Sequence, residues 1–164
     1  MTAAHLSPLG KPTAYQECYA PELLFPIPRQ GKRDELGLAA SLPFVGVDIW
    51  NGYELSWLNP KGKPQVAIAV FRVPADSPNL IESKSFKLYL NSFNHTRFES
   101  LEAVSATMAR DLSATAGRPV GVALQALSSS PTASIGSPDG ILIDDLDIEC
   151  DRYQPAPEFL TTRP

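Results

Sequence analysis

Cysteine and histidine are both scarce in this sequence, and their scarcity limits its chemistry. The 164 residues include two cysteines, Cys18 and Cys150, and two histidines, His5 and His95. Two cysteines are too few for a disulfide scaffold, and the four residues lack the close spacing of a zinc site. We therefore expect buried, reduced thiols and no metal site.

Long apolar runs and an excess of positive charge are also missing. A membrane-spanning helix requires about 20 apolar residues in a row, and no segment approaches that length. The first residues lack the basic and then apolar pattern of a signal peptide. The formal charge is −4 and the isoelectric point about 5.1, whereas nucleic-acid binding by counterion release needs a basic face. We expect a cytoplasmic protein that has no direct nucleic-acid or membrane partner.

Proline is abundant, but its distribution is uneven. The 16 prolines concentrate in the first and last quarters of the sequence. From Asn79 to Ala116 there is neither proline nor glycine, so the longest helices are expected there. With 43% hydrophobic and 20% charged residues, the sequence is typical of one globular domain.

Four segments have the composition of β-strands. Tyr53–Leu58 and Gln65–Val73 flank a cluster of turn-forming residues, which predicts an antiparallel hairpin. Pro119–Leu127 is also predicted as a strand. Leu142–Asp151 alternates acidic and apolar residues, which indicates a half-exposed strand rather than a metal site, because alternate side chains spread along a strand.

Two helices are predicted between these strand pairs. Glu82 to about Arg97 places apolar residues on one side, and Ser100 can cap a second helix that Gly117 ends. The resulting order is ββααββ. It favours an α+β fold in which an antiparallel sheet carries both helices on one face.

The start of the first predicted helix concentrates charged and hydroxyl groups. Unpaired backbone N–H groups and the helix dipole would add to Lys84 and Lys87 to form an anion pocket. The Glu82 carboxylate could accept paired N–H donors from a purine-like ring. Periodicity alone favours a solvated Glu/Lys face on an amphipathic helix over an anion pocket. The choice between these two interpretations therefore depends on the exact motif.

The string ESKSFKLY, from Glu82 to Tyr89, resembles the signature of the QueF family, NADPH-dependent 7-cyano-7-deazaguanine reductases of queuosine biosynthesis. The segments LGKPTAY, LLFPIPR, LPFVGVDIWNGYELSWLNPKGKPQVA, NLIESKSFKLYLNSFNHTRF and IDDLDI are similar to the N-terminal half of the two-module members. The resemblance runs from about Leu9 to Tyr153. It implies the tunnelling fold (T-fold), with a loop-rich segment at 1–43, the motif-bearing module at 44–153, and a tail or linker at 154–164.

The resemblance also implies roles for the motif residues. Glu82 would bind 7-cyano-7-deazaguanine, with Ser83 and Lys84 along the substrate edge. Lys84 and Ser85, with help from Lys87, would bind NADPH. Modules of this fold generally join through sheet edges, so a homo-oligomer is expected.

The family's cysteine nucleophile and aspartate proton donor are missing from the matching positions. Asn59 stands in place of the cysteine, and Gln65 stands roughly in place of the aspartate. Phe98-Glu99-Ser100 replaces the family's Phe-His-Glu substrate clamp. The resemblance therefore implies an N-terminal half that lacks catalytic residues and is inactive alone. Its reaction, a step in a tRNA-modification pathway, needs a second module.

Three alternatives stay open at this stage. Cys18 could act as the nucleophile, although no cation stands beside it in the sequence to favour a thiolate. The chain could be another T-fold enzyme acting on a purine or pterin, such as a zinc cyclohydrolase. It could also be a non-catalytic module that completes the site of another subunit.

Overall fold

The computed structural model describes residues 10–12, 16, 18–38, 41–127, 136 and 139–160. The chain divides into two compact units, Met1–Pro131 and Thr132–Pro164. Within the described residues, no helix is both long and apolar enough to cross a membrane.

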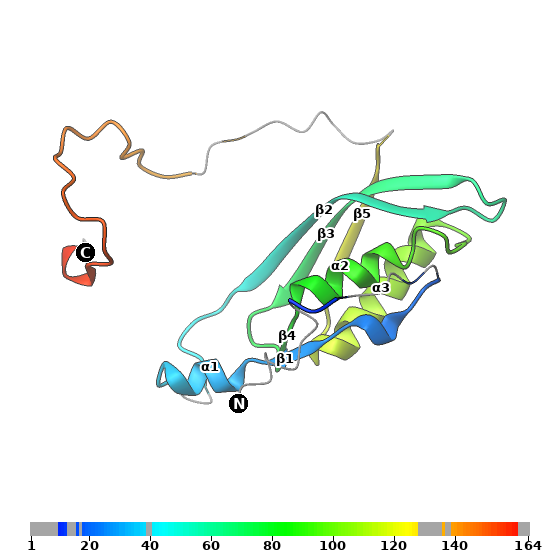
Figure 1. Cartoon of the computed structure of the whole chain (residues 1–164), viewed down its shortest axis with the longest axis horizontal. Coiled ribbons are helices and arrows are strands. Elements are labelled where there is room, and N and C mark those ends of the chain that lie inside the picture. Colours follow the sequence, from blue (N-terminus) through cyan, green and yellow to red (C-terminus); the bar gives the residue numbers. More distant parts are fainter. Residues whose placement is uncertain are drawn as a thin grey trace. The chain divides into compact units, whose positions relative to one another are not determined.

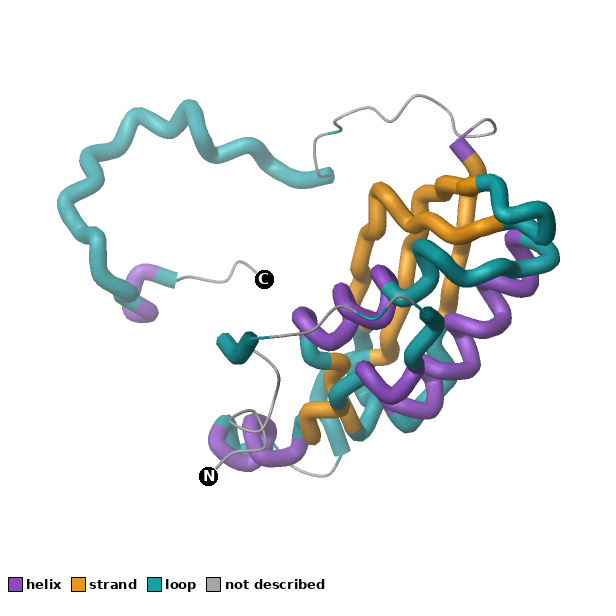
Figure 2. Tube along the Cα trace, turned by 45° about the vertical axis from the view of Figure 1, so that its right-hand side comes forward, coloured by secondary structure: helices purple, strands orange, loops and turns teal. Residues whose placement is uncertain are grey.

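The centre of the first unit is a three-stranded antiparallel sheet. Strands β2 (Val47–Leu58), β3 (Pro64–Pro74) and β5 (Gly121–Ala126) lie in the order β2-β3-β5. Helices α2 (Ser83–Asn91) and α3 (Leu101–Ala116) lie on one face of this sheet (Figures 1 and 2). The findings therefore support an α+β fold with antiparallel pairing.

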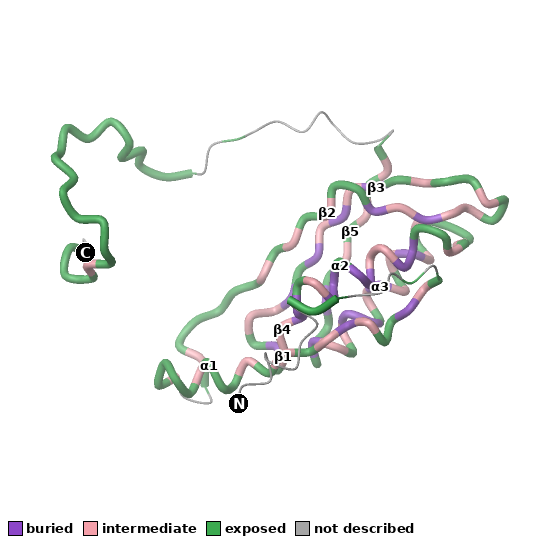
Figure 3. Tube along the Cα trace, in the orientation of Figure 1, coloured by how far each residue is buried: buried purple, intermediate pink, exposed green. Residues whose placement is uncertain are grey.

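Strand alternation explains how the sheet meets the helices. Ala67, Ala69, Phe71 and Val73 alternate along β3 and are at most 2% exposed, because they face α2 and α3. The buried residues gather between the sheet and the helices (Figure 3). From the helix side the core receives Phe86, Tyr89, Phe93, Val104, Met108 and Leu112.

The predicted hairpin and the second helix are confirmed. The β2–β3 turn is fixed by Asn59, whose Oδ1 accepts hydrogen bonds from the Lys61 and Lys63 N–H groups over 3.0 and 2.9 Å. The Ser100 hydroxyl caps α3 by accepting from the Ala103 N–H over 3.2 Å. Gly117 ends α3 in a left-handed conformation with φ of 76°.

The first predicted helix is shorter than expected. It ends at Asn91 rather than near Arg97, because the chain beyond it pairs with the end of β2. The Leu58 N–H donates to the Thr96 carbonyl and the Phe98 N–H donates to the Leu58 carbonyl, each over 2.9 Å. These hydrogen bonds require extended backbone where the sequence predicted a helical turn.

The strand predicted at Leu142–Asp151 is wrong, and the exact ββααββ order is not confirmed. Residues 139–160 of the second unit contain turns and coil, with one 3₁₀ turn at Pro157–Phe159. Leu146 and Ile148, expected on a buried face, are 56% and 66% exposed. An alternating pattern makes a strand only where a neighbouring strand pairs with its backbone.

Short elements join the N-terminal part of the first unit to the chain before α2. Strand β1 (Pro26–Pro28) pairs with β4 (Asn79–Ile81) in a two-stranded antiparallel sheet. A 3₁₀ turn at Pro21–Leu23 precedes this pair, and helix α1 (Gln30–Glu35) follows β1. The pairing of β1 with β4 holds the chain directly before the start of α2.

Residues 19–25 form a segment that runs along α2, which we call the strap. The Tyr19 N–H donates to the Thr96 hydroxyl oxygen over 2.9 Å. The Ala20 N–H donates to the Ser92 hydroxyl oxygen over 3.1 Å. The Phe25 N–H donates to the Ser85 hydroxyl oxygen over 3.0 Å. Each hydroxyl also donates to a carbonyl of its own helix or the following turn. The strap therefore fixes the orientation of α2.

Candidate functional site

The motif begins at the N-terminus of α2, where Glu82 is the cap. Its Oε1 accepts a hydrogen bond from the Lys84 N–H over 2.9 Å, and its Oε2 accepts one from the Ser85 N–H over 2.6 Å. Glu82 is only 3% exposed. The sequence predicted unpaired N–H groups here, and that prediction is wrong for these two donors because the chain supplies its own anion.

Ser85 is fully buried, although the resemblance placed it against the cofactor. Its Oγ accepts from the Phe25 N–H over 3.0 Å and donates to the Glu82 carbonyl over 2.7 Å. Its hydroxyl therefore joins the strap to the helix start instead of facing a ligand.

The remaining polar motif residues are accessible. Ser83 and Lys87 are exposed on the same side of α2, one helical turn apart. Lys84 is half-buried, and its Nζ donates to the Lys11 carbonyl. Phe86 and Tyr89 are core residues.

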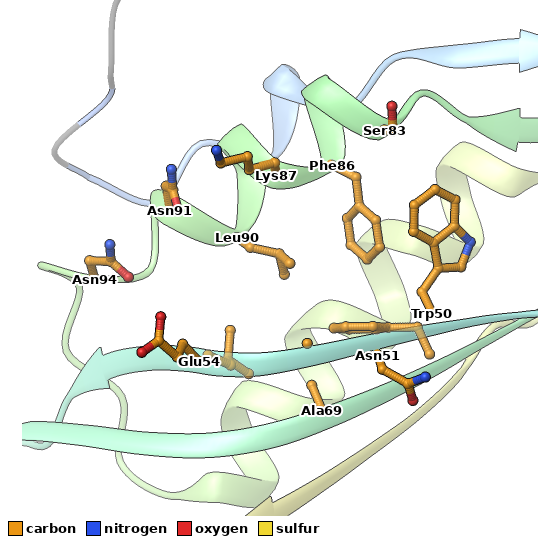
Figure 4. A pocket seen from close by; sticks show the side chains of 13 residues that line it. Trp50, Asn51, Glu54, Ala69, Ser83, Phe86, Lys87, Leu90, Asn91 and Asn94 are labelled. Carbon is orange, nitrogen blue, oxygen red and sulfur yellow. The ribbon is translucent and has the colours of Figure 1, made fainter. Parts of the chain in front are cut away.

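Ser83 and Lys87 line a pocket of about 220 Å³ between α2 and the β2–β3 hairpin, which we call the helix pocket. Figure 4 shows Lys87 and Asn91 on the helix side, with Glu54 of β2 on the opposite side. The Phe86 ring meets the Trp50 ring edge to face, with centroids 5.7 Å apart. The helix pocket thus combines an aromatic end with a polar end of both charge signs.

Sequence reasoning missed the residues that β2 and the turn after α2 bring to the helix pocket. These are Trp50, Glu54, Asn91 and Asn94. Glu54 lies within the register shift of β2, between Gly52 and Leu55. A charged residue inside an apolar strand was the only available signal, because the bulge that redirects it depends on pairing with β3.

A second cavity, of about 200 Å³, lies between the β2–β3 turn and the start of α3, and we call it the turn pocket. The structure brings together here the residues that the resemblance places at the family's reactive positions. Asn59 and Gln65 line it from the hairpin, and Phe98, Glu99 and Ser100 line it from the segment before α3. Neither cysteine lines either pocket.

A buried carboxylate connects the strap with both helices. Asp111 is 8% exposed, and its Oδ2 accepts from the Tyr19 and Tyr89 hydroxyls over 2.6 and 2.7 Å. Arg110 Nε donates to Asp111 Oδ1 over 2.9 Å. Burial and the Asp111 hydrogen bond raise the pKa of Tyr19 to about 12, and the same causes raise the pKa of Tyr89.

The cysteines and histidines do not converge on a site within the described part of the chain. Cys18 and Cys150 are both exposed, so the prediction of buried thiols is wrong. His95 is exposed, and His5 lies outside the described residues. Across the described ranges, no group of three or more His, Cys, Asp or Glu residues is arranged to hold a metal ion.

The family model for nitrile reductase, 7-cyano-7-deazaguanine-reductase N-term, matches residues 15–124. The chain belongs to this family. The match includes the whole of α2 and every residue of the Asp111 cluster. It also includes all the lining residues of both pockets except Ala126.

Curated reductases of several bacteria are similar to nearly the whole chain. The protein named NADPH-dependent 7-cyano-7-deazaguanine reductase of Dechloromonas aromatica is 70% identical over 162 residues, covering 98% of this chain and 57% of the relative. The protein of the same name from an Azoarcus strain is 61% identical over 159 residues, covering 96% and 57%. This chain therefore spans little more than half the length of these QueF-family relatives.

Proposed function

We propose that this chain is the N-terminal part of a two-module NADPH-dependent 7-cyano-7-deazaguanine reductase. The whole enzyme would convert the nitrile to 7-aminomethyl-7-deazaguanine during queuosine biosynthesis. The observation that carries the proposal is the complete motif from Glu82 to Tyr89, which starts α2 directly beside the helix pocket. The length of the reductases it resembles, of which it covers 57%, supports a further module.

Within this proposal, the accessible motif residues contact ligands. Ser83 and Lys84 would line the edge of 7-cyano-7-deazaguanine, and Lys84 and Lys87 would bind the phosphates of NADPH. The donor set suits phosphate oxygens, because ammonium and hydroxyl groups are hydrogen-bond donors. The phosphates would be held by side chains, since Glu82 already accepts from the Lys84 and Ser85 N–H groups.

Glu82 and Ser85 would act as positioning residues instead of the direct ligand contacts that the resemblance implied. Glu82 fixes the first turn of α2, and Ser85 ties that turn to the strap. Together they set where Ser83 and Lys84 emerge from the helix. A displaced first turn would move both accessible donors away from their ligand atoms.

The reaction needs groups that neither pocket supplies. NADPH supplies hydride when bound, and a thiolate is needed to add to the nitrile carbon. The turn pocket offers Asn59 and Gln65 at the matching positions, and an amide is not a nucleophile. The thiolate and its proton donor would therefore come from the second module.

The fold and assembly complete the proposal. The described sheet and helices would form a T-fold module within residues 44–153. Strands β2 and β5 are the two edges of the three-stranded sheet, and such edges are templates for pairing with another strand. We propose that they join modules into a homo-oligomer.

Binding without turnover tests this proposal. The purified chain is mixed with 7-cyano-7-deazaguanine and NADPH, and both nucleotide binding and NADPH consumption are followed. We expect binding and no consumption, and we expect consumption after addition of the C-terminal part of the Dechloromonas aromatica relative. Steady consumption by the chain alone, abolished by Cys18→Ala, would overturn the half-enzyme proposal.

A non-catalytic module that completes the site of another subunit is a second candidate. The absence of a thiol among the lining residues of both pockets favours it. Addition of the C-terminal part of the Dechloromonas aromatica relative separates this candidate from the first proposal. A module for a separate protein would bind ligand but would not restore consumption with the C-terminal part of a reductase.

A further inference from the structure

Asp111 of α3 is the point at which the strap, α2 and α3 meet. Its Oδ2 accepts from the Tyr19 hydroxyl over 2.6 Å and from the Tyr89 hydroxyl over 2.7 Å. Its Oδ1 accepts from Arg110 Nε over 2.9 Å, and Arg110 Nη2 donates to the Tyr19 hydroxyl over 2.8 Å. A carboxylate that is only 8% exposed is costly unless its oxygens accept hydrogen bonds. These contacts therefore hold the Asp111 side chain in one orientation.

Tyr89 connects the motif to this cluster. It is the last residue of the motif, lies in the last turn of α2, and is fully buried. The Phe93 ring meets the Tyr89 and Tyr19 rings edge to face, with centroids 5.1 and 5.4 Å away. The two tyrosines thus pack on the same ring and donate to the same carboxylate oxygen. They differ in the segment that carries them, because Tyr89 belongs to α2 and Tyr19 to the strap.

The side of α2 that carries Tyr89 is different from the side that carries the exposed motif donors. An α-helix turns by about 100° per residue, so Lys87 and Ser83 project about 200° and 240° around the axis from Tyr89. Both donors are exposed, and both line the helix pocket opposite Glu54 (Figure 4). A rotation of α2 that displaced the Tyr89 hydroxyl would therefore also move these donors relative to the opposite wall.

We propose that Asp111 is a positioning residue for the motif helix. Through the Tyr89 hydroxyl it sets the rotation of α2 about its own axis, and thereby the direction in which Ser83 and Lys87 reach ligand atoms. Asp111 lines neither pocket, so it acts on ligand only through α2. This role rests on the proposed function, because Ser83 and Lys87 are its ligand donors. A donor displaced from its ligand atom contributes less to binding.

The two tyrosines supply a matched pair of variants. Tyr89→Phe and Tyr19→Phe each remove one hydroxyl that donates to Asp111 Oδ2, and each leaves the other hydroxyl in place. Both variants keep the ring that packs on Phe93. A merely structural role of the cluster predicts that the two variants affect ligand binding equally. A positioning role that acts through α2 predicts that Tyr89→Phe has much the larger effect.

NADPH titrations of the whole chain measure this difference, in buffer where circular dichroism shows that each variant is folded. We expect Tyr89→Phe to weaken NADPH binding about fivefold and Tyr19→Phe to weaken it less than about twofold. Asp111→Ala removes the acceptor itself. In that background Tyr89→Phe should change the affinity less than about twofold, because two changes that break one interaction are not additive. The tyrosine pair decides the question even if Asp111→Ala does not fold.

Trp50 reports the orientation of α2 without any ligand. Its ring meets the Phe86 ring of α2 edge to face, with centroids 5.7 Å apart and planes at 81°. The sequence has two tryptophans, so a Trp57→Phe background leaves Trp50 as the single emitter. In this background we expect Tyr89→Phe to shift the emission maximum of the ligand-free chain. Tyr19→Phe should leave that maximum unchanged.

The two measurements separate this role from the proposed function. If the parent chain binds no NADPH, the proposed phosphate contacts are wrong, and the Trp50 emission still tests whether Asp111 orients α2 through Tyr89. An unshifted emission in Tyr89→Phe would overturn the positioning role in either case. Where the parent binds NADPH, equal losses of affinity in the two tyrosine variants would also overturn it. The same holds for additive effects of Tyr89→Phe and Asp111→Ala, or for a shifted emission with unchanged affinity.

Discussion

Glu82 and Ser85 are joined by two reciprocal hydrogen bonds at the start of α2. The Ser85 N–H donates to Glu82 Oε2 over 2.6 Å, and the Ser85 hydroxyl donates to the Glu82 carbonyl over 2.7 Å. Both residues are at most 3% exposed. Two residues of the family motif therefore form a rigid helix start, while Ser83 and Lys87 remain accessible at its surface.

Glu82→Ala should lower the free energy of unfolding by about 2 kcal/mol, because the Lys84 and Ser85 N–H groups lose their acceptor. Glu82→Gln, which retains one acceptor oxygen, should lose about half as much. Urea unfolding measures both changes. Glu22→Ala, at an exposed position, is the control and should stay within about 0.5 kcal/mol of the parent. Equal stability of Glu82→Ala and this control would contradict the capping role.

Ser85→Ala should mainly lower the stability of the chain, whereas Ser83→Ala should mainly lower its affinity for ligand. Ser85→Ala leaves the Phe25 N–H without its acceptor and should cost about 1.5 kcal/mol of stability, and it should weaken ligand binding less than Ser83→Ala does, because Ser85 acts only by positioning the first turn of α2. Ser83→Ala should leave stability unchanged and weaken the binding of 7-cyano-7-deazaguanine about fivefold, the equivalent of one hydrogen bond. Urea unfolding and a titration with 7-cyano-7-deazaguanine measure the two quantities. A loss of affinity in Ser85→Ala at unchanged stability would instead make Ser85 a ligand contact.

Local signals explain which elements could be predicted from the sequence. The hairpin depends on strand alternation around a turn cluster, and α3 depends on a serine cap and a glycine stop, all within one segment. Strands β1 and β4 are three residues long and pair Pro26–Pro28 with Asn79–Ile81. Their pairing joins segments far apart in the chain, so no local pattern predicts it.

The candidate site was predictable only in part, for a similar reason. The motif string identified Ser83, Lys84 and Lys87, but the inward turn of the Glu82 carboxylate was missed, because glutamate is not a favoured N-cap residue. The turn pocket needs the segment before α3 to lie against the hairpin. The substitutions at Asn59 and Gln65 were visible in the sequence, whereas their convergence with Glu99 required the fold.

Alkaline pH should destabilise the chain through Tyr19 and Tyr89, the two tyrosines that donate to Asp111. Partial burial and the Asp111 hydrogen bond raise the pKa of Tyr19 from its usual value of 10.0 to about 12, so the unfolded state releases this proton first as pH rises. The stabilisation is complete below pH 10.0 and is lost as pH rises toward about 12. Urea midpoints across this range should fall less steeply for Tyr19→Phe than for the parent.

Tyr53→Phe is the matched control for this pH dependence, because Tyr53 is 68% exposed. Its urea midpoints should follow the parent curve. Adding Tyr89→Phe to Tyr19→Phe should flatten the curve further, since the pKa of Tyr89 is raised as well. A Tyr19→Phe curve as steep as that of Tyr53→Phe would contradict the assignment.

Lys87→Ala should weaken NADPH binding about fivefold at low ionic strength, because one exposed ammonium group is removed from the proposed phosphate contacts. The difference from the parent should shrink as salt is added, since exposed charges are screened. Lys84→Ala should show the same salt dependence, whereas Lys61→Ala, in the β2–β3 turn, should bind as the parent does. Titrations at two salt concentrations measure all three variants. Unchanged affinity of both motif-lysine variants at low salt would show that α2 does not bind the phosphates.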